Sequence, residues 1–357
     1  MRILVLGAGG YLGGHVTERL RALPGTRVLV GGRSPAADVT LDLASDRPNV
    51  LAGALARARP DAVVNCAGAT GGDAVTLAEV NARGPAVLCA ALREAAPTAR
   101  LVHLGSAAEY GPGTPGLRVT ETEACLPAGP YGATKLAGTV AVTASGLDAV
   151  VLRVGNPVGA GAPPTGLPGR VAALLAEAEE EAASASGGGA GSWAGPVGGT
   201  GDGPVGRSGG GPDGGAGGAG GGPGGCTGGG PDGGPGAGPE LRLGDLSAYR
   251  DFVDVRDVAR AVELAVTAAA ALPPVLNVGG GEAVPVRELV RRLAETAGFR
   301  GRIVEADGSG SARSAQVSWQ CSDIGAARLA LGWRPSYSLD ASLEALWAAH
   351  PVRVAAP

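Results

Sequence analysis

Three residues of types that serve acid–base chemistry stand at positions where they can meet. Tyr131 and Lys135 are four residues apart in Tyr-Gly-Ala-Thr-Lys, and Ser106 precedes them in Gly-Ser-Ala-Ala-Glu-Tyr-Gly. Residues four apart on a helix share one face, so the phenol and the amine can contact the same ligand. A phenol with a pKa of about 10 is a weak acid–base group at neutral pH, and an adjacent ammonium stabilises the phenolate. The pattern predicts a proton-transfer site built from serine, tyrosine and lysine.

The lysine of this pattern is unusual in the composition. The chain has 29 basic residues, and Lys135 is the only lysine among them. Arginine supplies all the other positive side chains, which indicates that Lys135 is required for its own chemistry. A planar guanidinium is no substitute for an ammonium at such a site.

A second pattern, near the N-terminus, is typical of dinucleotide binding. Gly7, Gly10 and Gly13 follow an apolar run and open a helical stretch. Backbone without side chains can approach a pyrophosphate closely, and the free N–H groups at a helix start can bind it. We therefore predict that a nicotinamide dinucleotide is held by Gly7, Gly10, Tyr11, Leu12 and Gly13.

The end of the next strand bears on the choice of cofactor. An NAD enzyme usually carries an acid there for the ribose 2′-hydroxyl, but this chain has Gly-Gly-Arg-Ser at residues 31–34. Arg33 and Ser34 can form charge-assisted hydrogen bonds to a 2′-phosphate, which favours NADP(H). NAD(H) is the alternative if Arg33 is an ordinary exposed arginine. The residues expected to line the adenine and ribose pocket are Asp42, Leu43, Ala67 and Gly68.

Alternating elements must position these residues. Buried strands are predicted at residues 2–6, 27–30, 61–66, 101–104 and 149–154, with helices at 12–23, 75–92 and 131–144 between them. This alternation predicts right-handed βαβ crossovers and an α/β fold with a doubly wound parallel Rossmann sheet. Ligands of such sheets bind at the carboxyl ends of the strands.

The rest of the chain predicts a smaller mixed α/β substrate domain. Its helices are predicted at 170–185, 285–297 and 340–349 and its strands at 240–244 and 302–305. The helix at 255–270 and the strands at 251–255 and 275–278 are predicted to return to the first domain. We assign residues 1–165 with 250–278 to the cofactor domain, and 166–186, 240–249 and 279–357 to the substrate domain. Residues 187–239 contain 29 glycines in 53 positions. Such a segment buries little apolar area, so we expect a flexible, disordered insert.

Composition excludes several function classes. With 29 basic and 33 acidic residues the net charge is −4, which argues against nucleic-acid binding. The apolar start is interrupted by Gly7 and no run of 18 apolar residues exists, so neither a signal peptide nor a membrane span is expected. Scattered cysteines and histidines give no metal-binding spacing. We expect a cytoplasmic protein without a metal.

These motifs resemble those of the extended short-chain dehydrogenases/reductases, which include sugar-nucleotide epimerases, dehydratases and reductases. The resemblance covers nearly everything except residues 187–239. It implies that Ser106, Tyr131 and Lys135 form a catalytic triad and that Asn81, in Val-Asn-Ala-Arg-Gly, orients a proton-relay water. Within the family, residues 105–111 and 250–258 look most like the reductases of GDP-4-keto-6-deoxymannose.

The resemblance implies a reaction: hydride transfer from NADPH to the ketone of a 4-keto-6-deoxy sugar nucleotide or a related compound. Tyr131 would donate a proton to the carbonyl oxygen and Ser106 would hydrogen-bond it. Lys135 would lower the tyrosine pKa and hold the nicotinamide ribose. The candidates for binding the diphosphate of a nucleotide-sugar are Asn156, Arg170 and Arg313. A purely structural role stays open for each of them.

The chain also departs from the family. The 4,6-dehydratases carry an Asp-Glu pair directly after the catalytic hydroxyl residue, where this chain has Ala107 and Ala108. It therefore lacks the acid and base for water elimination. Two alternatives stay open: a redox-neutral epimerase with tightly bound NAD, and a non-catalytic NADP-binding sensor. The resemblance and the arginine-rich composition suggest a role in antibiotic biosynthesis, and a homodimer is left open.

Overall fold

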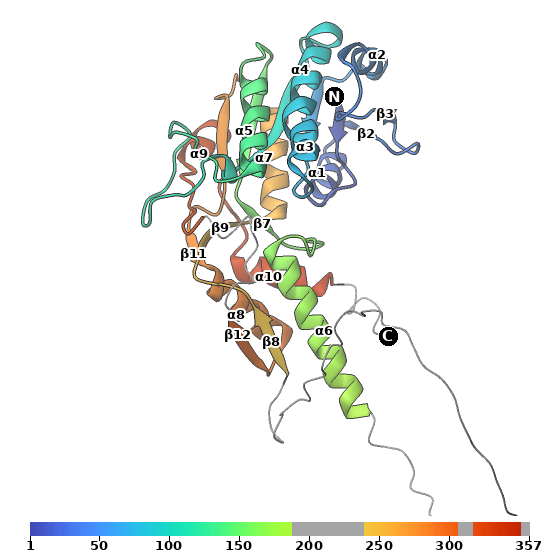
Figure 1. Cartoon of the computed structure of the whole chain (residues 1–357). Helices are drawn as coiled ribbons and strands as arrows, with labels where there is room; N and C mark the ends of the chain where they lie inside the picture. Colours follow the sequence, from blue (N-terminus) through green and yellow to red (C-terminus); the bar gives the residue numbers. More distant parts are fainter. Residues whose placement is uncertain (188–238, 306–316, 351–357) are drawn as a thin grey trace, which may run out of the picture.

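The computed structural model describes residues 1–187, 239–305 and 317–350 (Figure 1). The predicted insert therefore lies, except for its first and last residues, outside the described residues. The candidate Arg313 lies outside them as well.

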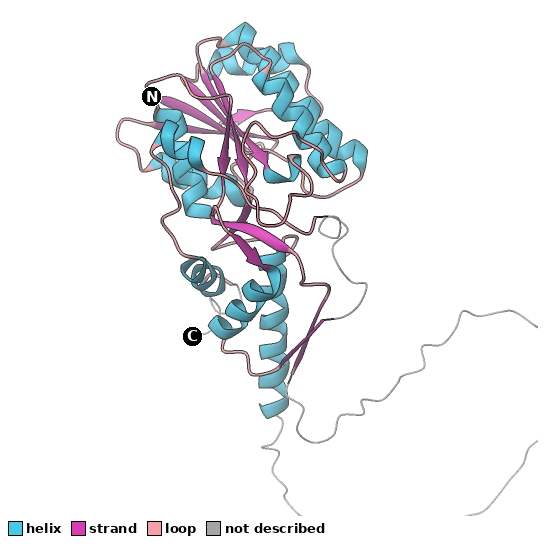
Figure 2. Cartoon of the chain, turned by 90° about the vertical axis from the view of Figure 1, so that its left-hand side faces the viewer, coloured by secondary structure: helices cyan, strands magenta, loops and turns pink. Residues whose placement is uncertain are grey.

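A seven-stranded parallel sheet forms the centre of the larger half of the protein (Figure 2). Its strand order is β10-β6-β5-β4-β1-β2-β3, and every neighbouring pair is parallel. The doubly wound α/β fold is thus confirmed. The strands are β1 Arg2–Leu6, β2 Arg27–Gly32, β3 Val39–Thr40, β4 Ala62–Asn65, β5 Arg100–Ser106, β6 Ala149–Val154 and β10 Val275–Val278.

Both faces of this sheet are covered by helices, which explains why its strands are nearly all apolar. Successive side chains of a strand point to opposite faces. In β1, Ile3 and Val5 pack in one core with α1 Tyr11–Arg21 and α7 Val255–Thr267. Leu4 and Leu6 pack in the other core with α2 Pro48–Ala58, α4 Gly84–Ala95 and α5 Pro130–Thr143.

The helix predicted over residues 75–92 is interrupted. The structure has α3 Ala74–Ala78, the π-helical turn η1 Glu79–Arg83 and then α4. Pro85 lies near the start of α4 and lacks the N–H that a continuous α-helix would use. A π turn inside a helix often marks a functional site, and η1 carries Asn81.

The smaller half lies below the large sheet in Figures 1 and 2. It has a three-stranded sheet of order β11-β9-β7 and a two-stranded sheet of β12 and β8. Its helices share a third hydrophobic core containing Leu175, Leu289 and Trp347. The elements are β7 Asn156–Val158, α6 Leu167–Gly187, β8 Glu240–Leu243, β9 Tyr249–Asp254, β11 Ala283–Pro285, α8 Val286–Ala297, β12 Arg302–Glu305 and α10 Leu339–Ala348.

One C-terminal helix packs with the larger half. α9 Gly325–Leu331 contributes Ala327 to the core that contains α1 and α7, and the fully buried Trp333 follows it there. The assignment of residues 279–357 to one substrate domain stays a prediction.

Candidate active site

The glycine turn has a geometry that only glycine permits at two of its positions. Gly7 has a φ of +77°, in the left-handed region, and the Gly10 N–H donates to its carbonyl at 3.0 Å. A Cβ on Gly13 would lie 2.0 Å from the Gly7 carbonyl oxygen, whereas one on Gly9 would meet nothing within 4 Å. The first turn of α1 holds no acid and no side-chain cap. The turn therefore presents open backbone at a helix N-terminus, which suits a pyrophosphate.

The glycine turn adjoins the end of β4 and, through it, α5. A Cβ on Gly7 would lie 2.6 Å from the Ala67 nitrogen. A Cβ on the next residue, Gly68, would lie 3.4 Å from Asn81 Oδ1 and 3.9 Å from Lys135 Nζ. The predicted cofactor residues thus lie at the carboxyl ends of β1 and β4, close to the predicted catalytic lysine.

Lys135 is buried between α5 and the central sheet. Its side chain is 5% exposed, and its Nζ donates to the Leu104 carbonyl oxygen at 2.5 Å, two residues before Ser106. Burial lowers the pKa of Lys135, and the nearby Glu109 carboxylate opposes that effect. Tyr131 lies one turn earlier in the first turn of α5 and is half-buried. The structure therefore brings Ser106, Tyr131 and Lys135 to the carboxyl end of β5.

Asn81 joins the loop after β4 to α5. Its Nδ2 donates to the Ala69 carbonyl at 2.8 Å and to Thr134 Oγ1 at 3.3 Å, and its Oδ1 accepts from the Ala69 N–H at 2.9 Å. The side chain is 1% exposed. These contacts place Asn81 beside Lys135 and Gly68. Its predicted role in orienting a water stays a prediction.

Ser106 begins a short 3-10 helix, η2 Ala107–Glu109, in a capping box. Its Oγ accepts from the Ala108 N–H at 3.2 Å, and Glu109 Oε1 accepts from the Ser106 N–H at 2.8 Å. Glu109 is not among the residues predicted from the sequence, although Ser-x-x-Glu is the capping-box pattern.

The predicted 2′-phosphate residues are exposed at the end of β2. Among the residues described, Arg33 forms no ion pair, and Ser34 Oγ accepts from the Ala36 N–H at 3.2 Å. Asp42 closes a local turn, because it accepts from the Ala44 N–H at 3.0 Å and from Ser45 Oγ at 3.0 Å.

The loop that carries Asp42 is fixed from two sides. Leu43 is buried in the core with α2 and α4. Arg83, which was not predicted as a site residue, donates to the carbonyls of residues 43–46. Direct cofactor contacts of Asp42 and Leu43 stay predictions.

The predicted substrate residues lie at separate places. Asn156 begins β7, and its Nδ2 donates to Gln320 Oε1 at 2.6 Å and to the Asp251 carbonyl at 3.1 Å. Arg170 is exposed in the first turn of α6.

Tyr11 and Leu12 follow the glycine turn in α1, and Tyr11 OH donates to the Gly159 carbonyl at 3.4 Å. That bond links α1 to the loop between β7 and α6.

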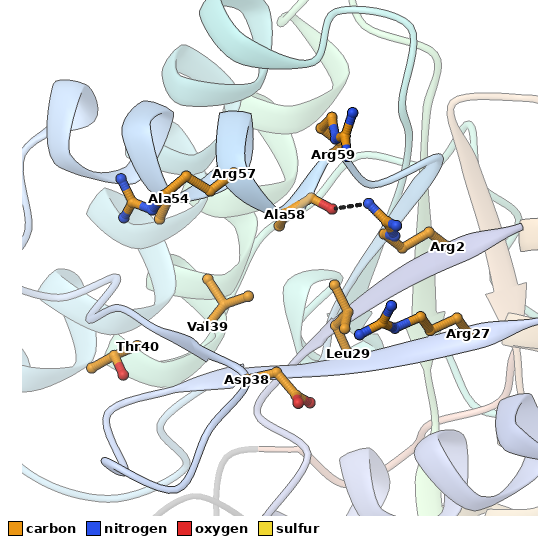
Figure 3. A pocket seen from close by; sticks show the side chains of 10 residues that line it. All are labelled: Arg2, Arg27, Leu29, Asp38, Val39, Thr40, Ala54, Arg57, Ala58 and Arg59. Atoms are coloured by element: carbon orange, nitrogen blue, oxygen red, sulfur yellow. Dashed lines mark hydrogen bonds between the residues drawn. The ribbon is translucent and has the colours of Figure 1, made fainter.

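A pocket of about 590 Å³ lies elsewhere on the larger half (Figure 3). Arg2, Arg27, Arg57 and Arg59 surround it, together with Asp38. Arg2 and Arg27 are the first residues of β1 and β2. Its arginines therefore lie at the amino ends of the strands, away from the glycine turn, whereas Val39 and Thr40 of its lining pair with Gly31 and Gly32 near the carboxyl end of β2. None of the predicted site residues lines this pocket.

Comparison with known proteins accounts for this arrangement. A model of the NAD dependent epimerase/dehydratase family matches residues 3–193 and 233–279. The chain belongs to this family. It is 34% identical over 362 residues to the dTDP-6-deoxy-L-talose 4-dehydrogenase (NAD(P)(+)) of Kitasatospora kifunensis, which covers 98% of this chain and 95% of that enzyme. Over 158 residues, 43% of this chain and 49% of the relative, it is 34% identical to the dTDP-4-dehydrorhamnose reductase of Burkholderia thailandensis.

Solved structures show the same fold. RMD from Pseudomonas aeruginosa, complexed with NADPH, has a TM-score of 0.73 at 22% identity and covers 99% of both chains. The Thermus thermophilus UDP-glucose 4-epimerase, in complex with NAD, has a TM-score of 0.70 at 25% identity and covers 100% of both chains.

The predicted resemblance is therefore confirmed, and this epimerase/dehydratase-family protein is an NAD(P)-dependent oxidoreductase. No helix within the described ranges has the length and apolar character needed to cross a membrane.

Proposed function

We propose that this protein is an NADPH-dependent ketoreductase that acts on the keto group of a 4-keto-6-deoxy sugar nucleotide or a related ketone. The observation that carries the proposal is the burial of the chain's single lysine beside Ser106 and Gly68, one helical turn from Tyr131. Burying an ammonium is costly, and the cost is explained if Lys135 serves a phenol and a cofactor ribose at the same edge.

Each residue has a role in this proposal. The glycine turn and the loop after β4 hold the dinucleotide, which supplies a hydride when bound. Tyr131 donates a proton to the carbonyl oxygen, while Ser106 hydrogen-bonds that oxygen and keeps the carbonyl against the phenol. Lys135 favours the phenolate that Tyr131 becomes. Asn81 orients the water that returns the proton.

The preference for NADP(H) rests on Arg33 and Ser34. Both side chains are exposed at the end of β2, and residues 31–34 contain no acid to repel a 2′-phosphate. The carboxylate of Asp38 is hydrogen-bonded to the Val30 N–H of β2. The relative from Kitasatospora kifunensis is named for both NAD and NADP, so we expect NADH to support a slower reaction.

The sugar-nucleotide substrate is supported by the names of the two relatives, a dehydrogenase and a reductase of dTDP-linked deoxy sugars. Arg170 and Arg313 remain the proposed diphosphate ligands, and for Asn156 we propose the structural role that its hydrogen bonds support. In the structure the Asn156 amide already bonds Gln320 and Asp251, so we place more weight on Arg170. Ala107 and Ala108 follow Ser106, and neither can serve as the acid or base of a dehydratase.

An epimerase is the second candidate, because a UDP-glucose 4-epimerase shares the fold over the whole chain. The experiment that separates the two measures NADPH oxidation by the purified full chain against a panel of enzymatically generated 4-keto-6-deoxy sugar nucleotides. Net oxidation with at least one of them is expected. Firmly bound NAD⁺ with no net oxidation would instead indicate the epimerase.

A further inference from the structure

Glu109 is a buried carboxylate that none of the roles above uses. It is fully buried, on η2, between β5, β6 and α5. A Cβ on Gly105 would lie 2.7 Å from Glu109 Oε1 and 3.3 Å from Arg153 Cγ. A side chain at position 105 would have to displace this carboxylate and the Val151 methyl group, so Gly105 leaves the space that the carboxylate occupies.

One oxygen of Glu109 holds the backbone of Ser106. Oε1 accepts from the Ser106 N–H at 2.8 Å, which closes the capping box. The η2 turn also rests on α5, since a Cβ on Gly132 would lie 2.4 Å from the Ala108 carbonyl oxygen. Glu109 thus fixes the turn that sets Ser106 against the first turn of α5, where Tyr131 lies.

The other oxygen of Glu109 anchors the carboxylate to the sheet. Oε2 accepts from Arg153 Nε at 2.8 Å, and Arg153 is buried on β6. The Arg153 guanidinium lies 4.5 Å over the Tyr110 ring, and Tyr110 OH donates to Asn277 Oδ1 at 2.8 Å. The ion pair with Arg153 therefore fixes the Glu109 carboxylate, and Arg153 is itself held against Tyr110.

Glu109 also lies close to Lys135. Lys135 Nζ donates to the Leu104 carbonyl oxygen, and a Cβ on the next residue, Gly105, would lie 2.7 Å from Glu109 Oε1. Among the described residues, the ionisable groups that interact with Lys135 include Glu109 on η2, Cys66 after β4 and His103 on β5. Tyr131 shares its helix. Burial lowers the pKa of Lys135 and the Glu109 carboxylate raises it. Cys66 and His103 are themselves buried, and burial disfavours the charged form of both, since it raises the pKa of the thiol to about 12 and lowers that of the imidazole. Glu109 is therefore the carboxylate that favours the ammonium form of Lys135.

We propose that Glu109 is a positioning residue of the active site, whose carboxylate fixes Ser106 through its backbone N–H and keeps the buried Lys135 an ammonium. The Ser106 part rests on the proposed function. The Lys135 part does not, because it concerns protonation of one side chain whatever the substrate.

The single lysine gives a direct test of the charge. Full-length protein grown on lysine labelled with ¹³C and ¹⁵N carries one labelled side chain, whose Cε signal is followed against pH. In Glu109→Gln, which keeps the volume and an acceptor for the Ser106 N–H, the midpoint of the Lys135 titration is expected to move to lower pH. In Glu109→Asp, which keeps the charge, it should stay near that of the wild type. Glu123→Gln, at an exposed position in the following loop, is the matched control.

A second readout tests the positioning of Ser106. Glu109→Asp is one methylene shorter and cannot reach both the Ser106 N–H and Arg153. Its kcat for NADPH oxidation should fall about 100-fold, because small displacements of a catalytic group are that costly, while its Kd for NADPH stays within about threefold of the wild type. Circular dichroism checks the fold. If Glu109→Gln does not fold, Glu109→Gln combined with Arg153→Met removes both partners of the buried pair and is expected to keep the lower midpoint.

An unchanged Lys135 midpoint in Glu109→Gln would overturn the role of Glu109 in keeping the ammonium. A Glu109→Asp variant with wild-type kcat would overturn its role in placing Ser106. If the wild type oxidises no NADPH with any ketone, the proposed function fails, and the titration of Lys135 still decides the first part.

Discussion

The predicted cofactor site at the glycine turn and the predicted substrate residues around Asn156 are built in different ways. At the glycine turn, Gly7, Gly10 and Gly13 contact one another within seven residues, and any added Cβ on Gly13 would overlap the backbone of Gly7. On the substrate side, Asn156 contacts Gln320, 164 residues later. Local contacts leave a motif in the sequence and distant ones do not. The difference explains why the dinucleotide can be inferred from sequence more firmly than the sugar.

The largest effect is expected at Lys135, which is proposed to stabilise the Tyr131 phenolate and to hold the cofactor ribose. Lys135→Arg should lower kcat for NADPH oxidation by about 10²- to 10⁴-fold, because the guanidinium is too broad for the buried position and a poor replacement for the ammonium. Steady-state kinetics measures it. Arg57→Lys, the reverse exchange at an exposed position, should leave kcat unchanged. A Lys135→Arg enzyme within about threefold of the wild type would remove the special status of the lysine.

The next effect tests whether close backbone packing in the glycine turn is needed for cofactor binding. Gly13→Ala should raise the Kd for NADPH about 100-fold, because its Cβ would overlap the Gly7 carbonyl and widen the turn. Gly9→Ala is the matched control, since its Cβ has open space, and should change the Kd less than about threefold. Fluorescence titration with NADPH measures both. Equal losses in the two variants would show that the turn binds through something other than close backbone packing.

A smaller change is expected in cofactor preference. Arg33→Ala should raise the Kd for NADPH about tenfold, because one charge-assisted hydrogen bond is lost, and should leave the Kd for NADH within about twofold. Arg57→Ala, at the opposite sheet edge (Figure 3), serves as the control. If Arg33→Ala weakens NADH and NADPH equally, Arg33 does not read the 2′-phosphate.

The smallest effect is expected on the substrate side. Asn156→Ala removes the hydrogen bonds to Gln320 and the Asp251 carbonyl and should lower the free energy of unfolding by about 1 kcal/mol. Its KM for the sugar nucleotide should rise less than about tenfold. Urea unfolding and kinetics are measured together, with Asn49→Ala, exposed on α2, as the control. A large rise in KM without a loss of stability would make Asn156 a ligand rather than a brace.

Much of the fold follows from the sequence because the strands that bear the site are buried on both faces. Most residues of 2–6, 149–154 and 275–278 are apolar, and the structure has strands at those positions. The short strand β3 and the helix α2 were not predicted. β3 has only two residues, too few for a periodic pattern.

The site is predictable only in part, for physical reasons. Ser106, Tyr131 and Lys135 lie in local motifs on one strand end and one helix. Asn81 could be predicted only from the family resemblance, because the π-helical turn that carries it has no periodic sequence pattern. Glu109 and Arg153 are 44 residues apart, and their pairing follows from β5 and β6 being neighbours. Charge pairs across strands are set by sheet order, which composition does not fix.

The most direct test of the account measures NADPH oxidation and NADPH binding for Tyr131→Phe, with Tyr337→Phe, exposed near α10, as the control. The account predicts that Tyr131→Phe loses turnover with the best sugar-nucleotide ketone by about 10²- to 10⁴-fold and binds NADPH within about threefold of the wild type. Tyr131→Phe turning over at the wild-type rate would contradict it, because the proton would then come from another group.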